Sequence, residues 1–257
     1  MSSDQRDLLF DIGNTRVKWG IAIDGEIRRT GTISHERLRE QGYSALTTRL
    51  PTKVDAVLAS NVAGQTFATR LSGVIGMHCN TDVHFARSAA EGFGVTNSYR
   101  QPRKLGVDRW VAMIGARAFS HKALCIVDAG TAVTIDALDS SGQHLGGQIL
   151  PGIHLMNNAL AEDTSDLPAV KRAASNKLDS LPGFASSTSK AIYSGAMGAV
   201  CGAVERAMRA MRSAGYRPLL ILTGGDASRI LPVLDGAAEH RPHLVLEGLA
   251  IINKGKQ

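Results

Sequence analysis

The chain has 257 residues, of which 44% are hydrophobic and 20% charged, with a formal net charge of +6. This composition is ordinary for a globular protein and excludes a disordered or collagen-like chain, while the length allows one large domain or two smaller ones. The basic residues are scattered, so nucleic-acid binding is not expected, and the positive charge would instead help to attract polyanionic nucleotides.

The cysteines and the hydropathy pattern limit the cellular setting. The three cysteines lie far apart, without the spacing of a zinc or redox site, which fits structural thiols in a reducing compartment. The first residues have no hydrophobic signal core, and no apolar run is long enough to span a bilayer. We therefore expect a cytoplasmic protein without membrane contact.

The first elements in chain order predict a three-stranded meander. Leu8–Phe10 is a short apolar run, and after a turn at Gly13–Asn14 apolar and polar residues alternate from Arg16 to Ile23. A second tight turn at Asp24–Gly25 leads into a third predicted strand over Glu26–Ile33.

Alternating strands and helices follow the meander. Val54–Val62 has the pattern of a strand, and Gln65–Ile75 and Val107–Ala118 have helical periodicity.

The second half of the chain repeats the first. Ala123–Val127 predicts a buried strand, Asp128–Thr131 a turn, and Val133–Leu138 a second strand. A long helix over Thr188–Ala214, a strand over Leu219–Thr223 and a helix over Asp226–Leu234 complete the series.

The repeat predicts an α/β fold of two duplicated ribonuclease H-like domains, over residues 1–119 and 120–257. Two halves that each open with a hairpin carrying an Asp-x-Gly turn have the layout of the actin-like ATPase superfamily, in which a nucleotide lies in a cleft between the halves. Because fold alone does not fix function, the chemistry must come from the turns themselves.

The turn Asp11–Thr15 suits a phosphate. Glycine allows close approach of backbone N–H groups, Asn14 and Thr15 add donors, and Lys18 adds a cation. Asp11 could hold Mg²⁺ directly or through water. The same residues also make a good hairpin turn, but the second copy at Asp128–Thr131 favours the phosphate interpretation. No Walker loop, complete dinucleotide fingerprint or protein-kinase signature is present.

Six short motifs then resemble one family, the type III pantothenate kinases. In order along nearly the whole chain they are Asp11–Thr15, Gly106–Arg109, Asp128–Thr131, Gly146–Gly152, Thr223–Asp226 and Leu246–Leu249. The resemblance implies ATP-dependent phosphorylation of the primary hydroxyl of pantothenate, the first committed step of coenzyme A synthesis, in a homodimer.

The resemblance also implies roles for individual residues. Asp108 would be the general base, and substrate contacts would come from Tyr99, Gly106, Val107, Asp108, Arg109 and Thr188. ATP contacts would come from Asp11, Ile12, Gly13, Asn14, Thr15, Arg16, Val17, Lys18 and Thr131. Asp128 resembles a ligand for a monovalent cation, K⁺ or NH₄⁺, although it could instead serve Mg²⁺ or be structural.

Several alternatives stay open at this stage. Asp108 precedes a predicted helix, where the helix dipole favours an ionised carboxylate, but a simple helix cap would need the same residue. The small residues Ala191, Gly195, Gly198 and Gly202 could serve internal packing or a dimer contact. A transcription accessory factor of the same sequence family, or a kinase for another small alcohol, is the alternative function.

Overall fold

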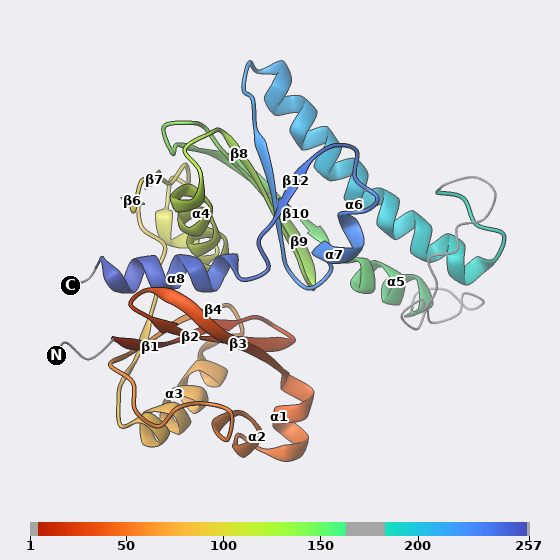
Figure 1. The fold of residues 1–257 in the computed structure, drawn as a ribbon. Coiled ribbons are helices and arrows are strands. Elements are labelled where there is room, and N and C mark those ends of the chain that lie inside the picture. Colours follow the sequence, from red (N-terminus) through yellow and green to blue (C-terminus); the bar gives the residue numbers. More distant parts are fainter. Residues whose placement is uncertain (1–4, 163–182, 256–257) are drawn as a thin grey trace. The chain divides into compact units, whose positions relative to one another are not determined.

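The computed structural model describes residues 5–162 and 183–255, which form two compact units (Figure 1). The first unit runs to His121 and also contains Ser140–His144 and the segment from His243 onward. The second unit contains Lys122–Asp139 and the described residues between Leu145 and Pro242. The domains expected from the sequence, residues 1–119 and 120–257, are contiguous, whereas these two units are discontinuous, since Ser140–His144 and the segment from His243 belong to the first unit.

The first unit is built on a five-stranded sheet in the order β3-β2-β1-β4-β5. β1, β2 and β3 form the predicted antiparallel meander, and β4 and β5 continue the sheet in parallel with β1. The bounds are β1 Arg6–Ile12, β2 Arg16–Ile23, β3 Glu26–Ser34, β4 Ala56–Asn61 and β5 Val83–Phe85.

Helices cover both faces of this sheet. One face packs its apolar side chains, among them Phe10 and Trp19, with Leu71 and Ile75 of α3, and the other face is covered by α8 (Figure 1). The helices of the unit are α1 His35–Gln41, α2 Ser44–Thr47, α3 Gln65–Cys79, α4 Val107–Phe119 and α8 Leu244–Lys254. A small hairpin, β6 Glu91–Gly92 with β7 Val95–Thr96, and a 3-10 turn, Pro102–Lys104, precede α4.

The second unit repeats the arrangement with the sheet order β10-β9-β8-β11-β12. Its apolar core joins one face of the sheet to α5, α6 and α7. The bounds are β8 Leu124–Ala129, β9 Ala132–Leu138, β10 His144–Pro151, β11 Leu219–Thr223, β12 Ala238–His240, α5 Ile153–Glu162, α6 Thr188–Ser213 and α7 Ala227–Ile230.

The two sheets have the same strand order, and the pairings of β1, β2, β4 and β5 have the same directions as those of β8, β9, β11 and β12, so the predicted duplication of a ribonuclease H-like α/β fold is confirmed. The expected helix over Asp226–Leu234 was wrong in length, since α7 ends at Ile230. Pro232 explains the early end, because proline has no backbone N–H to donate to the carbonyl four residues earlier.

The long helix α6 leaves its small residues uncovered. Gly195, Gly198 and Gly202 are exposed, and a side-chain carbon added at any of them would meet no atom within 4 Å in the described structure. They therefore do not serve internal packing among the described residues. Within that same part of the chain, no helix is long and apolar enough to cross a membrane.

Candidate active site

The turn between β1 and β2 is open to close approach from outside. It is closed by a hydrogen bond from the Gly13 N–H to the Arg16 carbonyl (3.1 Å), and α1 is tied to it by a bond from the His35 N–H to the Thr15 carbonyl (2.9 Å). Gly13 has no positive φ, and a Cβ there would meet only the Arg16 oxygen, at 3.5 Å. Neither the backbone conformation nor the packing demands glycine, so its lack of a side chain mainly leaves room for a ligand.

The residues on either side of this turn point away from it. The side chains of Ile12 and Val17 are fully buried in the apolar core beneath the sheet, whereas Asn14, Thr15 and Arg16 are exposed. Of the segment expected to contact ATP, Ile12 and Val17 can therefore offer only backbone atoms.

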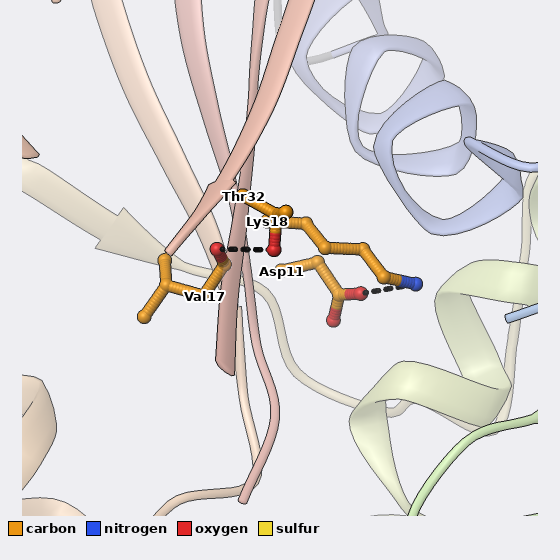
Figure 2. A network of polar contacts seen from close by, with 4 residues as sticks. All are labelled: Asp11, Val17, Lys18 and Thr32. Atoms are coloured by element: carbon orange, nitrogen blue, oxygen red, sulfur yellow. Dashed lines mark hydrogen bonds and ion pairs between the residues drawn. The ribbon is translucent and has the colours of Figure 1, made fainter. Parts of the chain in front are cut away.

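A row of polar residues crosses the opposite face of the sheet beside the turn. Asp11 pairs in register with Lys18 on one side and with Ser60 on the other, and Lys18 pairs with Thr32. The Lys18 ammonium lies 3.8 Å from the Asp11 carboxylate, and the Thr32 hydroxyl donates to the Val17 carbonyl at 3.3 Å (Figure 2). Register alone thus places a carboxylate and a cation side by side at the end of the hairpin.

Asp11 is better suited to bind Mg²⁺ together with substrate phosphates and water than to form part of a metal site built from protein side chains alone. Its carboxylate is 11% exposed. No group of three or more His, Cys, Asp or Glu residues that could hold a metal occurs in residues 5–162 or 183–255. Mg²⁺ typically uses one or two carboxylates together with substrate phosphates and water, and a single carboxylate at the strand end before the Gly13 turn suits that donor set.

Ser60 is a polar residue of the row that sequence analysis missed. It is completely buried, and its hydroxyl has no hydrogen-bond partner in the described part of the chain. A buried hydroxyl without a partner costs about 1–3 kcal/mol, which favours a partner that is not part of the chain, such as water or a ligand.

Asp108 lies in the first turn of α4 on the first unit. Gly106 takes the N-cap position, and Asp108 is the second helical residue, where its Oδ1 accepts a hydrogen bond from the Arg109 N–H (2.8 Å). A Cβ on Gly106 would lie 2.7 Å from that same oxygen, so glycine makes room for the carboxylate. The positive end of the helix dipole favours the ionised carboxylate that a general base needs.

Arg109 and Tyr99, both expected at the substrate site, meet in the structure. Arg109 is buried, its Nη1 donates to the Tyr99 hydroxyl (3.0 Å), and its guanidinium lies 5.8 Å from the centre of the Tyr99 ring. The ring stacks at 6.1 Å with that of His144, which is 1% exposed and lies 3.1 Å from the Ser98 hydroxyl. The tyrosine and the arginine are therefore held in a defined arrangement.

A close crossing of α4 and α8 fixes the helix that carries Asp108. A Cβ on Gly115 would lie 2.6 Å from the Leu244 carbonyl oxygen, and one on Gly248 would lie 2.8 Å from Val111 Cγ1. Both glycines are thus required for the two backbones to approach. This packing accounts for the Leu246–Leu249 motif, which no chemical role explained.

The second unit has its own Asp-x-Gly turn after β8, with glycines packed against it. The Gly152 N–H donates to the Thr131 carbonyl (2.9 Å), and a Cβ on Gly152 would lie 2.5 Å from that oxygen. Gly224 has a φ of +94°, and its Cβ would lie 2.5 Å from Asp128 Oδ1. The motifs Gly146–Gly152 and Thr223–Asp226 therefore come together around the Asp128 turn.

The two turns are related but not identical. Four residues separate the paired Ile12 and Val17 in the first, whereas three separate the paired Ala129 and Val133 in the second. Thr131 is exposed in this shorter turn, and Thr188 is the exposed first residue of α6. Asp128, Thr131 and Thr188 all belong to the second unit, and the other expected site residues belong to the first.

Comparison with known proteins decides the family. A family model described as Type III pantothenate kinase matches residues 7–210. The chain belongs to the type III pantothenate kinase family. The enzyme of that name from Nitrosococcus oceani is 35% identical over 254 residues, covering 96% of this chain and 93% of the relative. The one from Halorhodospira halophila is 38% identical over 250 residues, covering 94% and 95%.

A solved structure agrees at the level of the fold. A protein from Campylobacter jejuni named as a Baf family transcriptional activator has a TM-score of 0.61 and 21% identity, covering 97% of this chain and 98% of that protein. At that identity the similarity shows the fold alone.

Sequence analysis of this type III family member did not identify three residues that shape the site: Ser60, His144 and Gly115. Ser60 follows the apolar residues of β4, next to the strand of Asp11, which is a usable signal once the sheet order is known. His144 lies 45 residues beyond Tyr99 in the chain, and Gly115 lies within an ordinary helical pattern, so neither gives a local signal.

Proposed function

We propose that this protein transfers the γ-phosphoryl group of ATP to the primary hydroxyl of pantothenate, the first step of coenzyme A synthesis. The observation that carries the proposal is the 35–38% identity to type III pantothenate kinases over nearly the whole of both chains. The alternative of a transcription accessory factor gains nothing from the fold similarity to the Campylobacter jejuni protein, since that similarity concerns fold alone.

Asp108 is assigned as the general base. Its carboxylate takes the proton of the pantothenate hydroxyl while that oxygen forms a bond to the γ-phosphorus and the bond from phosphorus to the β–γ bridging oxygen breaks, releasing ADP. Phosphoryl transfer asks little more of the protein than positioning and charge stabilisation. The support is the position of Asp108 in the first turn of α4, with a glycine at position 106, where a Cβ would lie 2.7 Å from the Asp108 Oδ1.

Arg109 and Tyr99 are assigned to the substrate. Pantothenate carries a carboxylate, and a guanidinium already oriented by a tyrosine hydroxyl is suited to bind one with directional hydrogen bonds. Gly106 and Val107 are assigned to the same substrate through the backbone before α4, and Thr188 through its exposed hydroxyl.

The turn from Gly13 to Arg16 and the Lys18 ammonium are assigned to the phosphates of ATP, with Thr131 as a further ATP contact. Asp11 would hold Mg²⁺, which supplies neutralisation of phosphate charge when bound. Asp128 is assigned to a monovalent cation, and its support is the tight backbone packing that fixes its Oδ1 beside Gly224. ADP release should then be faster in K⁺ or NH₄⁺ than in Na⁺ at equal ionic strength, and equal rates would leave Asp128 a structural role.

We also assign a homodimer. Its support is the exposed row of small residues on α6, which nothing in the described chain covers. Analytical ultracentrifugation should give twice the chain mass of 27.2 kDa, and a monomer at micromolar concentration would contradict the assignment.

An acceptor screen tests the proposed function. Purified protein is given ATP and Mg²⁺ with pantothenate or with a panel of sugars and other small alcohols, and ADP is measured by a coupled assay. Pantothenate should be the only strong acceptor. Comparable rates with a sugar and none with pantothenate would point to a kinase with another substrate, and absence of turnover with every acceptor would overturn the kinase assignment.

A further inference from the structure

A pocket on the first unit is lined by residues other than those assigned to the reaction, although Arg100 directly follows Tyr99 in the chain. The pocket has a volume of about 700 Å³ and lies between the segment after β5 and the segment before α4. Its lining includes neither the β1–β2 turn nor Asp108, Arg109 or Tyr99. The lining residues are Arg87, Ser88, Ala89, Ala90, Arg100, Gln101, Pro102 and Arg103.

Three arginines in this lining, Arg87, Arg100 and Arg103, converge from two segments of the chain. All three are exposed, and none has a hydrogen bond or ion pair to another residue of the described structure. No Asp or Glu contributes to the lining. Three positive charges around one opening repel each other, and an anion placed among them would relieve that repulsion.

The two segments that carry the arginines are joined by polar contacts, of which the one from Ser88 is buried. The Ser88 hydroxyl donates to the Leu105 carbonyl (2.9 Å), and the Asn97 amide donates to the carbonyls of Ala89 (3.0 Å) and Pro102 (3.2 Å). The backbone of the pocket is thus organised before any ligand binds, which reduces the entropic cost of binding.

We propose that this pocket, referred to below as the arginine pocket, binds a phosphate group. Guanidinium groups present paired N–H donors that match phosphate oxygens, and a doubly charged phosphate neutralises more of the convergent charge than a carboxylate does. The pocket lining has no aromatic side chain on which a nucleobase could stack, so the ligand is a phosphate group rather than single-stranded nucleic acid.

The phosphate could come from a free inorganic anion or from a phosphorylated organic molecule, and the two sources share the same contacts. Binding is measured by isothermal titration calorimetry with nucleotide-free protein at constant ionic strength. The probes are inorganic phosphate, pyrophosphate and 4′-phosphopantothenate. For each probe, the comparison uses the part of the binding that is lost when the three arginines are replaced, because 4′-phosphopantothenate can also bind as product at the substrate site. A larger loss for the organic phosphate than for both inorganic probes identifies an organic ligand, and an equal or smaller loss identifies the free anion.

The decisive variant is the triple change Arg87→Gln, Arg100→Gln and Arg103→Gln. Its matched control is Arg206→Gln, Arg209→Gln and Arg212→Gln, which removes the same charge from exposed positions on α6. We expect the first to weaken phosphate binding by about 10-fold or more and the second to leave it unchanged. Circular dichroism verifies that both remain folded.

A third variant, Lys18→Met, separates the arginine pocket from the ATP site. It should retain the high-affinity phosphate binding that the arginine-pocket variant loses. Unchanged binding in the arginine-pocket variant would overturn the proposal, and loss of binding in Lys18→Met alone would place the anion at the β1–β2 turn instead. Because binding is measured without ATP or acceptor, a failure here does not bear on the proposed kinase activity.

Discussion

Replacing Gly115 by alanine tests whether the crossing of α4 and α8 positions Asp108. Gly115 is buried in the middle of α4, and an added Cβ would lie 2.6 Å from the Leu244 carbonyl oxygen and 3.1 Å from the Gly248 nitrogen. Ordinary contact distances are about 3.5–4.0 Å, so the helices must separate by roughly 1 Å. Both obstructing atoms belong to the backbone, so no side-chain rotation can relieve the overlap.

The expected cost follows from two opposing terms. Alanine in place of a helical glycine contributes up to about 1 kcal/mol of helix propensity, and overpacking of a core costs about 1–3 kcal/mol. Because the overlap is with backbone, we expect the upper end of the packing cost and a net loss of about 2 kcal/mol. Gly73→Ala is the matched control, since Gly73 is an exposed glycine in α3 with no atom within 4 Å of its added Cβ.

Urea unfolding of the two variants separates the effect of helix propensity from the cost of overpacking. Gly73→Ala should stabilise the protein by about 0.5–1 kcal/mol, so the two variants should differ by about 3 kcal/mol. A 1 Å displacement of a catalytic group can cost about 100-fold in rate, so kcat should fall in Gly115→Ala and stay unchanged in Gly73→Ala. Equal stability of the two variants, with wild-type turnover in both, would refute this account of the crossing.

Three further variants or probes test single residues. Lys18→Met should raise KM for ATP about 10-fold by removing the cation beside Asp11, and an unchanged KM would remove Lys18 from the site. Burial, and to a smaller extent the charge of Arg39, lowers the pKa of His35 below its ordinary value of 6.5. As the pH falls, His35 is therefore protonated in the unfolded chain before it is protonated in the folded protein, and the free energy of unfolding should decrease below pH 6.5. His35→Phe, which keeps the stacking on Phe67, should lose this dependence in urea unfolding at about pH 7.5 and about pH 5.5, whereas an unaltered dependence would assign it to other groups. Burial raises the pKa of Cys125 to about 12, so its alkylation by iodoacetamide at about pH 8 should be slow in the folded protein and fast in urea; rapid labelling of the folded protein would contradict the buried position.

The sequence predicted local features of the site better than distant ones. Alternation of apolar and polar residues predicted the β1–β2 hairpin, and a hairpin register then places Lys18 directly beside Asp11. The helix that begins at Val107 was predicted equally well, because its apolar residues recur with helical spacing and Gly106 precedes it.

Long-range packing was not predictable by the same means. Ser60 reaches Asp11 through the parallel pairing of β4 with β1, and His144 reaches Tyr99 from a segment beyond two further strands. No local pattern predicts which sheet the last helix covers. α8 follows the second unit in sequence, yet it packs on the sheet of the first unit. Such contacts depend on the whole fold, so sequence periodicity carries no signal for them.

The predicted roles of Ile12 and Val17 show a related limit. The turn motif includes them, yet strand alternation sends both side chains into the core while the residues between them remain exposed. A motif read as a continuous segment therefore overstates which side chains can meet a ligand.

The central claim is tested most directly by following formation of the phosphate ester of pantothenate by ³¹P NMR. Wild-type protein with ATP, Mg²⁺ and pantothenate should produce 4′-phosphopantothenate together with equimolar ADP, and Asp108→Asn should form it about 10²–10⁴ times more slowly while remaining folded. Absence of the ester with the wild-type protein, or its formation at the wild-type rate by Asp108→Asn, would contradict the account.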